Sequence, residues 1–210
     1  DVLIIGGGIS GASIARELSR WQLDILLVEK EADLAVQSSG RNDGEVHPGV
    51  DLRKGSLKQE YVLKGNRMYD QICEELDVPF RRCGQYVGFT QWRYLPVIFL
   101  YVLEKKYRCK VKDTRLVGRK AFRRAEPELN PDFKFAIYNP GAGCVCPYGL
   151  TIAYGENAVE NGARISLNTV VSDMEVKEGI IQCVHTNRGS IYPSLVINAA
   201  GTFAEDVAKM

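Results

Sequence analysis

Apolar residues recur with two periods along the chain, and the periods predict alternating strands and helices. Short apolar runs at 2–5, 25–28 and 195–197 predict buried strands. Between the first two runs, apolar residues spaced at three and four positions predict a helix over 9–20. The opening of the chain therefore predicts a strand–helix–strand unit of the Rossmann type.

Apolar runs and helical spacing also predict elements in the rest of the chain. Helical spacing predicts a long amphipathic helix over 57–76, and the C-terminal third contains a predicted meander of three short strands whose turns end in Gly179 and Gly189. The other expected elements are a helix over 94–107, a short helix stopped by Pro127, strands over 85–90 and 133–138, an extended segment over 144–146, and a helix over 147–161 that Gly162 ends.

Composition excludes several classes of protein. The chain has 210 residues, of which 45% are apolar, and 27 Lys and Arg balance 26 Asp and Glu, so no nucleic-acid partner is expected. The most apolar window, 95–103, is too short to span a bilayer. We expect a cytoplasmic protein without a transmembrane segment, with peripheral contact at the inner membrane left open. The chain begins inside its first predicted strand without Met, so we expect a fragment of a longer protein.

The six cysteines predict neither disulfides nor a metal site. No pair has CxxC spacing, so reduced structural cysteines are expected, with Cys144 and Cys146 in the core. The pairs Arg81-Arg82 and Arg123-Arg124 are expected on the surface.

The turn after the first strand carries the strongest chemical signal. Gly6, Gly8 and Gly11 have the spacing of a dinucleotide fingerprint, with roles in the tight turn, the approach to a pyrophosphate and the helix–strand packing. The following helix offers free N–H groups to phosphates. Glu29 ends the second strand, where its carboxylate can accept hydrogen bonds from a ribose, and Lys30 beside it joins the predicted cofactor-binding set.

Three later features favour FAD over NAD. The polar loop over 31–50 is long and aperiodic, and its residues Ser38, Ser39, Arg41 and Asn42 are predicted to bind phosphate or ribityl oxygens. The meander replaces a helical crossover before the strand at 195–197. The small residues from Ala199 to Gly201 then form a second close turn.

The motifs together resemble a known family. The chain resembles FAD-dependent oxidoreductases of the D-amino acid oxidase superfamily, especially glycerol-3-phosphate dehydrogenase-like and L-2-hydroxyglutarate dehydrogenase-like proteins. The segments that carry the resemblance are 39–49, 55–59, 65–67, 147–151, 156–162 and 196–201. The resemblance implies an α/β fold in which a Rossmann-like FAD-binding domain, residues 1–79 and 147–210, receives part of an antiparallel-sheet substrate domain, residues 80–146.

The resemblance also implies roles for individual residues. His47 corresponds to a family histidine beside the isoalloxazine ring and is the candidate catalytic base, with a structural role in its loop as the alternative. The implied FAD contacts are Gly6, Gly8 and Gly11 at the pyrophosphate, Glu29 at the adenosine ribose, Ser39 to Asn42 along the phosphates and ribityl chain, Val171 at the adenine edge, and Ala199 to Gly201 at the pyrophosphate side. Asp43, Glu45 and Pro48 depart from the family pattern, which has smaller or aliphatic residues there.

The predicted activity is oxidation of a small anionic secondary alcohol. Glycerol-3-phosphate is the first candidate substrate and L-2-hydroxyglutarate the second, followed by an amino acid or amine, and by an FAD-binding fragment or subunit without chemistry of its own. Arg41, or Arg53 with Lys54, are candidate cations for the substrate anion. Quinone, oxygen and a carrier protein all stay open as the electron acceptor.

Overall fold

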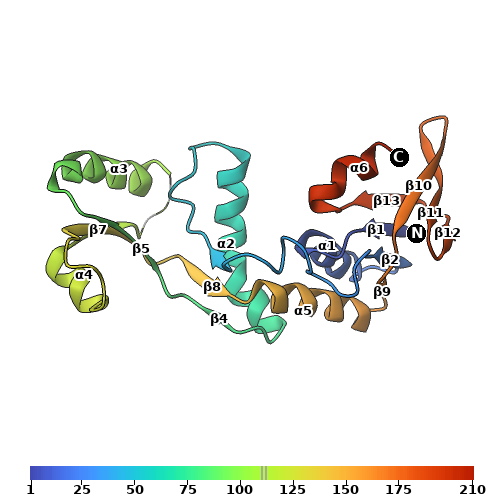
Figure 1. Ribbon diagram of the computed structural model, residues 1–210, viewed down its shortest axis with the longest axis horizontal. Coiled ribbons are helices and arrows are strands. Elements are labelled where there is room, and N and C mark those ends of the chain that lie inside the picture. The colour runs from blue at the N-terminus through green and yellow to red at the C-terminus, as the bar shows by residue number, and fades with distance from the viewer. Residues whose placement is uncertain (110, 112) are drawn as a thin grey trace. The chain divides into compact units, whose positions relative to one another are not determined.

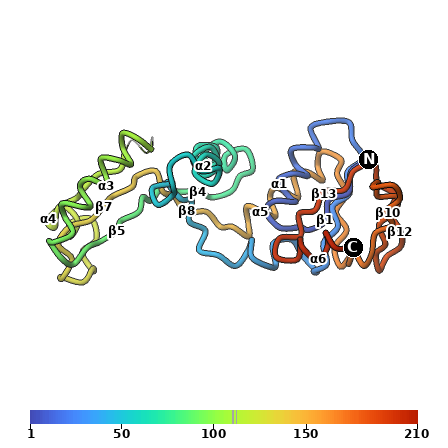
Figure 2. Tube along the Cα trace, turned by 90° about the horizontal axis from the view of Figure 1, so that it is seen from above, coloured from blue at the N-terminus to red at the C-terminus, as the bar shows by residue number. Residues whose placement is uncertain are grey.

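The computed structural model describes residues 1–109, 111 and 113–210, which form two compact units (Figures 1 and 2). The first unit comprises Asp1–Asp43, Glu74–Val78 and Cys146–Met210, and the second comprises Gly44–Cys73 and Pro79–Val145.

A parallel four-stranded sheet forms the centre of the first unit (Figure 1). Its order is β13 (Leu195–Asn198), β1 (Val2–Ile5), β2 (Ile25–Val28) and β9 (Arg164–Ser166). All four residues of β1 are buried, as expected for a parallel strand covered on both faces. The prediction of a buried strand at 195–197 is only partly right, because β13 lies at the sheet edge and leaves Leu195 54% exposed.

Two different layers cover this sheet. Helices α1 (Ile9–Leu18) and α5 (Pro147–Glu160) lie side by side in both views and pack with Val2 and Ile4 (Figures 1 and 2). Leu3 and Ile5 point to the opposite face, where they pack with the meander and the C-terminal helix. That layer consists of β10 (Val171–Lys177), β11 (Ile180–Thr186), β12 (Gly189–Ile191), the 3₁₀ turn η2 (Gly201–Phe203) and α6 (Ala204–Ala208).

The second unit contains two antiparallel sheets. One has the order β3 (Glu45–Val46), β8 (Gly143–Val145) and β4 (Phe80–Arg81); the other has the order β5 (Gln85–Phe89), β7 (Phe135–Asn139) and β6 (Arg115–Gly118). The helices are α2 (Leu57–Glu75), η1 (Trp92–Tyr94), α3 (Leu95–Tyr107) and α4 (Arg119–Ala125). Phe135, 2% exposed, stacks on Phe89 and Trp92 at the centre of the second sheet.

The compact units differ from the predicted domain boundaries in residues 44–73 and, by one residue each, at Pro79 and Cys146. Residues 44–73 group with the second unit because β3 pairs with β8 and because Arg82, just after β4, donates a hydrogen bond to the Asn66 carbonyl on α2. The amphipathic helix is present over nearly the predicted range, yet its apolar residues Leu57, Tyr61 and Met68 are exposed. None of the helices in the described part of the chain is long and apolar enough to cross a membrane.

Two expectations about side-chain burial were wrong. Cys144 and Cys146 are exposed, because Cys144 alternates with the buried Gly143 along β8 and Cys146 immediately precedes α5. Arg82, expected on the surface, is half-buried.

Candidate functional site

The glycine-rich turn between β1 and α1 is built by three close approaches. Gly6 has a φ of 109°, and a Cβ on it would lie 2.5 Å from the carbonyl oxygen of Ala199. A Cβ on Gly11 would overlap the carbonyl oxygen of Gly6. Both positions therefore require glycine, and the Ala199 turn lies directly against the fingerprint turn.

A cavity of about 280 Å³ opens at the carboxyl edge of the parallel sheet. Its walls come from the ends of β1, β2 and β13, the start of α1, the loop before Arg41 and α6. The lining residues are Ile5, Gly6, Gly8, Ser10, Val28, Glu29, Lys30, Gln37, Ser38, Ser39, Thr169, Val170, Val171, Ala199, Ala200, Gly201, Thr202, Phe203, Asp206, Val207 and Met210. Crevices at this edge are where open α/β sheets bind ligands.

Glu29 is held at the cavity by two backbone donors. Its Oε2 accepts a hydrogen bond from the Gly7 N–H at 2.5 Å, and its Oε1 accepts one from the Glu31 N–H at 2.9 Å. A carboxylate has about four acceptor sites, so Glu29 keeps capacity for ribose hydroxyls. Lys30 Nζ lies 3.4 Å from the centroid of the Phe203 ring.

The start of α1 is suited to an anion. Its first turn contains no acidic residue, and the hydroxyl of Ser39 accepts a hydrogen bond from the Ile9 N–H at 2.9 Å. The free N–H groups of a helix N-terminus and its partial positive charge favour phosphate. Glycines at 6 and 8 leave the backbone accessible, so these residues fit the pyrophosphate of a dinucleotide.

Four predicted residues do not line the cavity. Gly11 is buried against the fingerprint turn. Arg41 is exposed, and the Asn42 amide donates to the backbone carbonyls of Ser38 and Ser39 at 3.1 and 2.9 Å. His47 belongs to the second unit.

Sequence reasoning missed the part of the cavity that α6 and the segment after β9 supply. Thr169 N–H donates to the Glu29 carbonyl at 2.7 Å, which fixes this segment beside β2. Phe203, Asp206 and Met210 follow β13. Both segments follow the carboxyl end of a parallel strand. Because open α/β sheets bind ligands at this edge, the strand order alone would have identified both segments.

His47 lies beside a carboxylate in the second unit. Its side chain is 53% exposed, and its Nδ1 is 3.6 Å from Glu45 Oε1. Glu45 Oε1 also accepts a hydrogen bond from Gln85 Nε2 at 2.6 Å, and Gln85 Oε1 accepts one from the buried Asn139 at 3.1 Å. Glu45 is thus tied to the core of the β5-β7-β6 sheet, which fixes the carboxylate that faces His47.

A second network holds the backbone of His47. The amide of Asn66 on α2 donates to the His47 carbonyl at 2.9 Å and to the Gly141 carbonyl at 3.0 Å. Arg82 donates to the Asn66 side chain at 2.9 Å, to the Gly141 carbonyl at 2.7 Å and to Asp70 at 2.5 Å. Hydrogen bonding to Arg82 holds the pKa of Asp70 below its ordinary value of 3.8. Arg82 therefore stabilises the loop that carries His47.

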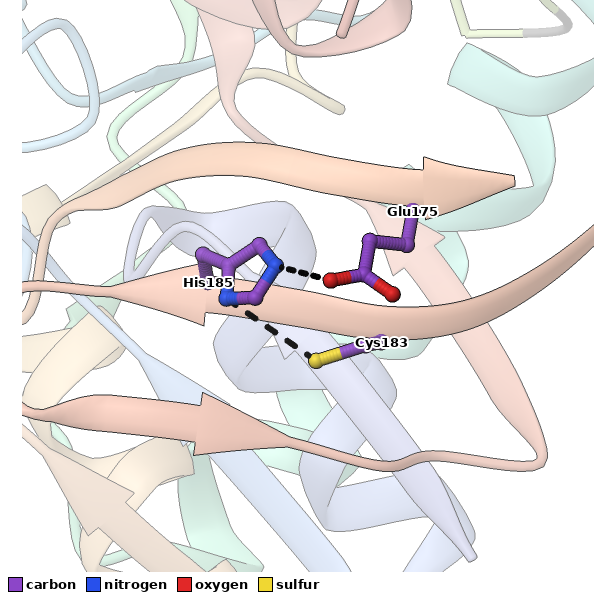
Figure 3. Close-up of side chains that lie close together, drawn as sticks. All are labelled: Glu175, Cys183 and His185. Atoms are coloured by element: carbon purple, nitrogen blue, oxygen red, sulfur yellow. Dashed lines mark hydrogen bonds and ion pairs between the residues drawn. The ribbon is translucent and has the colours of Figure 1, made fainter.

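The meander carries three metal-ligand residue types on one face (Figure 3). His185 Nε2 is 2.8 Å from Glu175 Oε1, while its Nδ1 is 2.9 Å from Ser190 Oγ and 4.0 Å from Cys183 Sγ. Figure 3 shows the Glu175 carboxylate and the Cys183 thiol beside different nitrogens of the His185 imidazole. The three side chains form a hydrogen-bonded cluster centred on His185.

The fold and the cavity are those of a flavoprotein, and comparison with known proteins identifies the family. Residues 1–210 match the family described as "FAD dependent oxidoreductase" (DAO), and the chain belongs to it. The expected fold, family and cofactor class, FAD, are thereby confirmed.

Relatives and solved structures agree with this assignment. The chain is 36% identical over 211 residues to a glycerol 3-phosphate dehydrogenase of Caloramator mitchellensis, covering 100% of the chain and 43% of that protein. It is 30% identical over 225 residues to a mitochondrial L-2-hydroxyglutarate dehydrogenase of Nematostella vectensis, covering 100% of the chain and 48% of that protein. The chain thus spans less than half the length of these relatives.

Among solved structures, an FAD-bound L-alpha-glycerophosphate oxidase of Mycoplasma pneumoniae has a TM-score of 0.85 at 25% identity, covering 100% of the chain and 56% of that structure. Glycine oxidase of Geobacillus kaustophilus has a TM-score of 0.89 at 22% identity, covering 100% and 57%, and supports the fold alone.

Proposed function

We propose that this chain contributes the FAD-binding part, and some of the substrate-binding part, of a dehydrogenase that oxidises a small anionic secondary alcohol. Glycerol-3-phosphate is the first candidate substrate. The observation that carries the proposal is the cavity at the carboxyl edge of the parallel sheet, together with 36% identity to a glycerol 3-phosphate dehydrogenase across the whole chain. L-2-hydroxyglutarate is the second candidate, because a relative of that activity is 30% identical across the chain.

The residues around the cavity divide the recognition of FAD. The backbone of Gly6 and Gly8 and the N-terminus of α1 bind the pyrophosphate, and Ser38 and Ser39 lie beside them. The Glu29 carboxylate accepts hydrogen bonds from the adenosine ribose. The other predicted FAD contacts that line the cavity are Lys30, Val171, Ala199 and Gly201.

His47 takes the proton of the substrate hydroxyl in this proposal. Bound FAD supplies the acceptor for the hydride that leaves the adjacent carbon. Nδ1 of His47 faces Glu45, so Nε2 is the nitrogen that receives the proton. The carboxylate of Glu45 stabilises the imidazolium that results, in the way that an acidic partner orients a catalytic histidine.

The cofactor assignment is tested on the purified 210-residue chain. Titration with FAD should produce a bound flavin spectrum and quenched flavin fluorescence. A chain that is folded by circular dichroism and gives no flavin signal would contradict the assignment.

The activity is tested on the full-length protein that contains this chain. Dye reduction with glycerol-3-phosphate, 2-hydroxyglutarate and glycine separates the candidate substrates, and turnover with glycine alone would refute the hydroxy-substrate proposal. His47→Gln should lower kcat about 100-fold or more while FAD stays bound. His185→Gln changes the other histidine of these 210 residues and is the matched control, with turnover per bound flavin unchanged.

A further inference from the structure

Two exposed thiols meet beside the β3-β8-β4 sheet of the second unit, one on β8 and the other in the segment that follows β4. The Sγ atoms of Cys83 and Cys144 lie 3.1 Å apart, although the residues are 61 positions apart in the chain. Both side chains are exposed, whereas Cys73, Cys109 and Cys183 are buried. The two sulfurs are therefore accessible to a reagent from solvent and already in contact.

The backbone on either side fixes this contact. Arg81 lies opposite Cys144 in the antiparallel register of β4 and β8. Immediately after Cys83, the Gly84 N–H donates to the Ala142 carbonyl at 3.0 Å, so the two segments stay paired beyond the strand. A disulfide bond has an S–S length of about 2.05 Å, which the two thiols reach by approaching about 1 Å.

We propose that Cys83 and Cys144 form a reversible disulfide when the chain meets a low-molecular-weight disulfide of the glutathione class. The two cysteines lack CxxC spacing, so the sequence alone does not reveal the pair. The proposal concerns a modification site and does not depend on the proposed function.

The exchange proceeds in two balanced steps. The Cys83 thiolate attacks one sulfur of the small disulfide, so a mixed disulfide forms and one small thiolate leaves. The Cys144 thiolate then attacks the Cys83 sulfur, the second small thiolate leaves, and the two protons of the protein thiols pass to the two released thiolates. Two protein thiols are oxidised and one small disulfide is reduced to two thiols.

Hydrogen bonding to Cys83, followed by burial, raises the pKa of the Cys144 thiol. The resulting disulfide bond would join the segment after β4 to β8, beside Glu45, which lies opposite Cys144 in the register of β3 and β8.

The experiment uses the whole 210-residue chain, incubated with oxidised and reduced glutathione at fixed ratios. After acid quenching, unfolding and alkylation, the fully reduced chain should carry label on all six cysteines and the oxidised chain on four, with an intact mass two hydrogens lower before labelling. Tryptic mapping should recover one linked pair of peptides, which dithiothreitol separates.

Variants identify the partners. Cys146 lies on the same tryptic peptide as Cys144 and is also exposed, so Cys146→Ser is the matched control and should keep the link. Cys83→Ser and Cys144→Ser should abolish it, with circular dichroism spectra like that of the wild type.

Three results would overturn the proposal: six labelled cysteines after oxidation, a link that is lost in Cys146→Ser, or glutathione that stays on Cys83 without transfer to Cys144.

Discussion

Replacing Glu29 with glutamine removes the negative charge at the end of β2 and keeps the length of the side chain. In the wild type both carboxylate oxygens accept backbone hydrogen bonds, from the Gly7 N–H at 2.5 Å and from the Glu31 N–H at 2.9 Å. In glutamine one of these oxygens becomes an NH₂ group, so one backbone donor faces another donor.

The magnitude follows from this contact. A hydrogen bond to a charged group contributes about 1.5–3 kcal/mol, so we expect the ligand-free Glu29→Gln chain to lose about 2–3 kcal/mol of unfolding free energy. At about 2–4 °C per kcal/mol for a chain of this size, Tm falls by about 4–12 °C. Loss of one charged acceptor for the ribose weakens FAD binding by about 10–150-fold.

Differential scanning calorimetry of the ligand-free chain measures the first effect, and calorimetric titration with FAD measures the second. Glu31→Gln is the matched control, because Glu31 makes surface contacts with Gln37 at 2.8 Å and Lys30 at 3.8 Å that contribute under about 1 kcal/mol. If Glu29→Gln binds FAD as tightly as the wild type, Glu29 does not bind the ribose. If its Tm is also unchanged, the backbone contacts do not stabilise the fold and the reasoning fails.

Three further substitutions test other parts of the structure by urea unfolding. Gly11→Ala places a methyl group against the Gly6 carbonyl and should cost about 1–3 kcal/mol; an unchanged midpoint would contradict this close approach. Arg82→Lys removes a forked donor from the network on α2 and should cost about 1–3 kcal/mol, whereas Arg81→Lys on its exposed neighbour stays within about 0.5 kcal/mol; equal effects would count against the network. The pKa of Asp70 is lowered in the fold, so its carboxylate stabilises the fold above its ordinary pKa of 3.8, and this contribution is lost as the pH falls through the lowered value. Asp70→Asn should therefore lower the midpoint at pH 7 but not in stronger acid, and a difference that persists in acid would exclude the ion pair as its cause.

The local elements of the first unit could be predicted from sequence because each has a local cause. The helix observed over Pro147–Glu160 begins at a proline, and Gly162, with a φ of 97°, follows its end. Glu178 and Gly179 both have positive φ, which produces the predicted hairpin turn between β10 and β11.

Features that depend on distant pairing could not be predicted in the same way. Residues 44–73 group with the second unit through the Glu45–Cys144 register, which no local pattern encodes. Of the predicted FAD contacts, those at the strand ends line the cavity, as do Gly6 and Gly8 of the fingerprint, whereas Gly11 is buried against the turn. In the aperiodic loop Ser38 and Ser39 line the cavity but Arg41 and Asn42 do not, because the direction of a side chain in such a loop depends on contacts that periodicity does not report.

The central sheet also determines the order in which a growing chain can fold. Val2 on β1 pairs with Leu195 on β13, 193 positions later, whereas the second unit lies entirely within Gly44–Val145. Pairing over such a separation closes a very long loop and slows folding. During synthesis the second unit can therefore form first, while β1 remains without its β13 neighbour until residue 198 has left the ribosome.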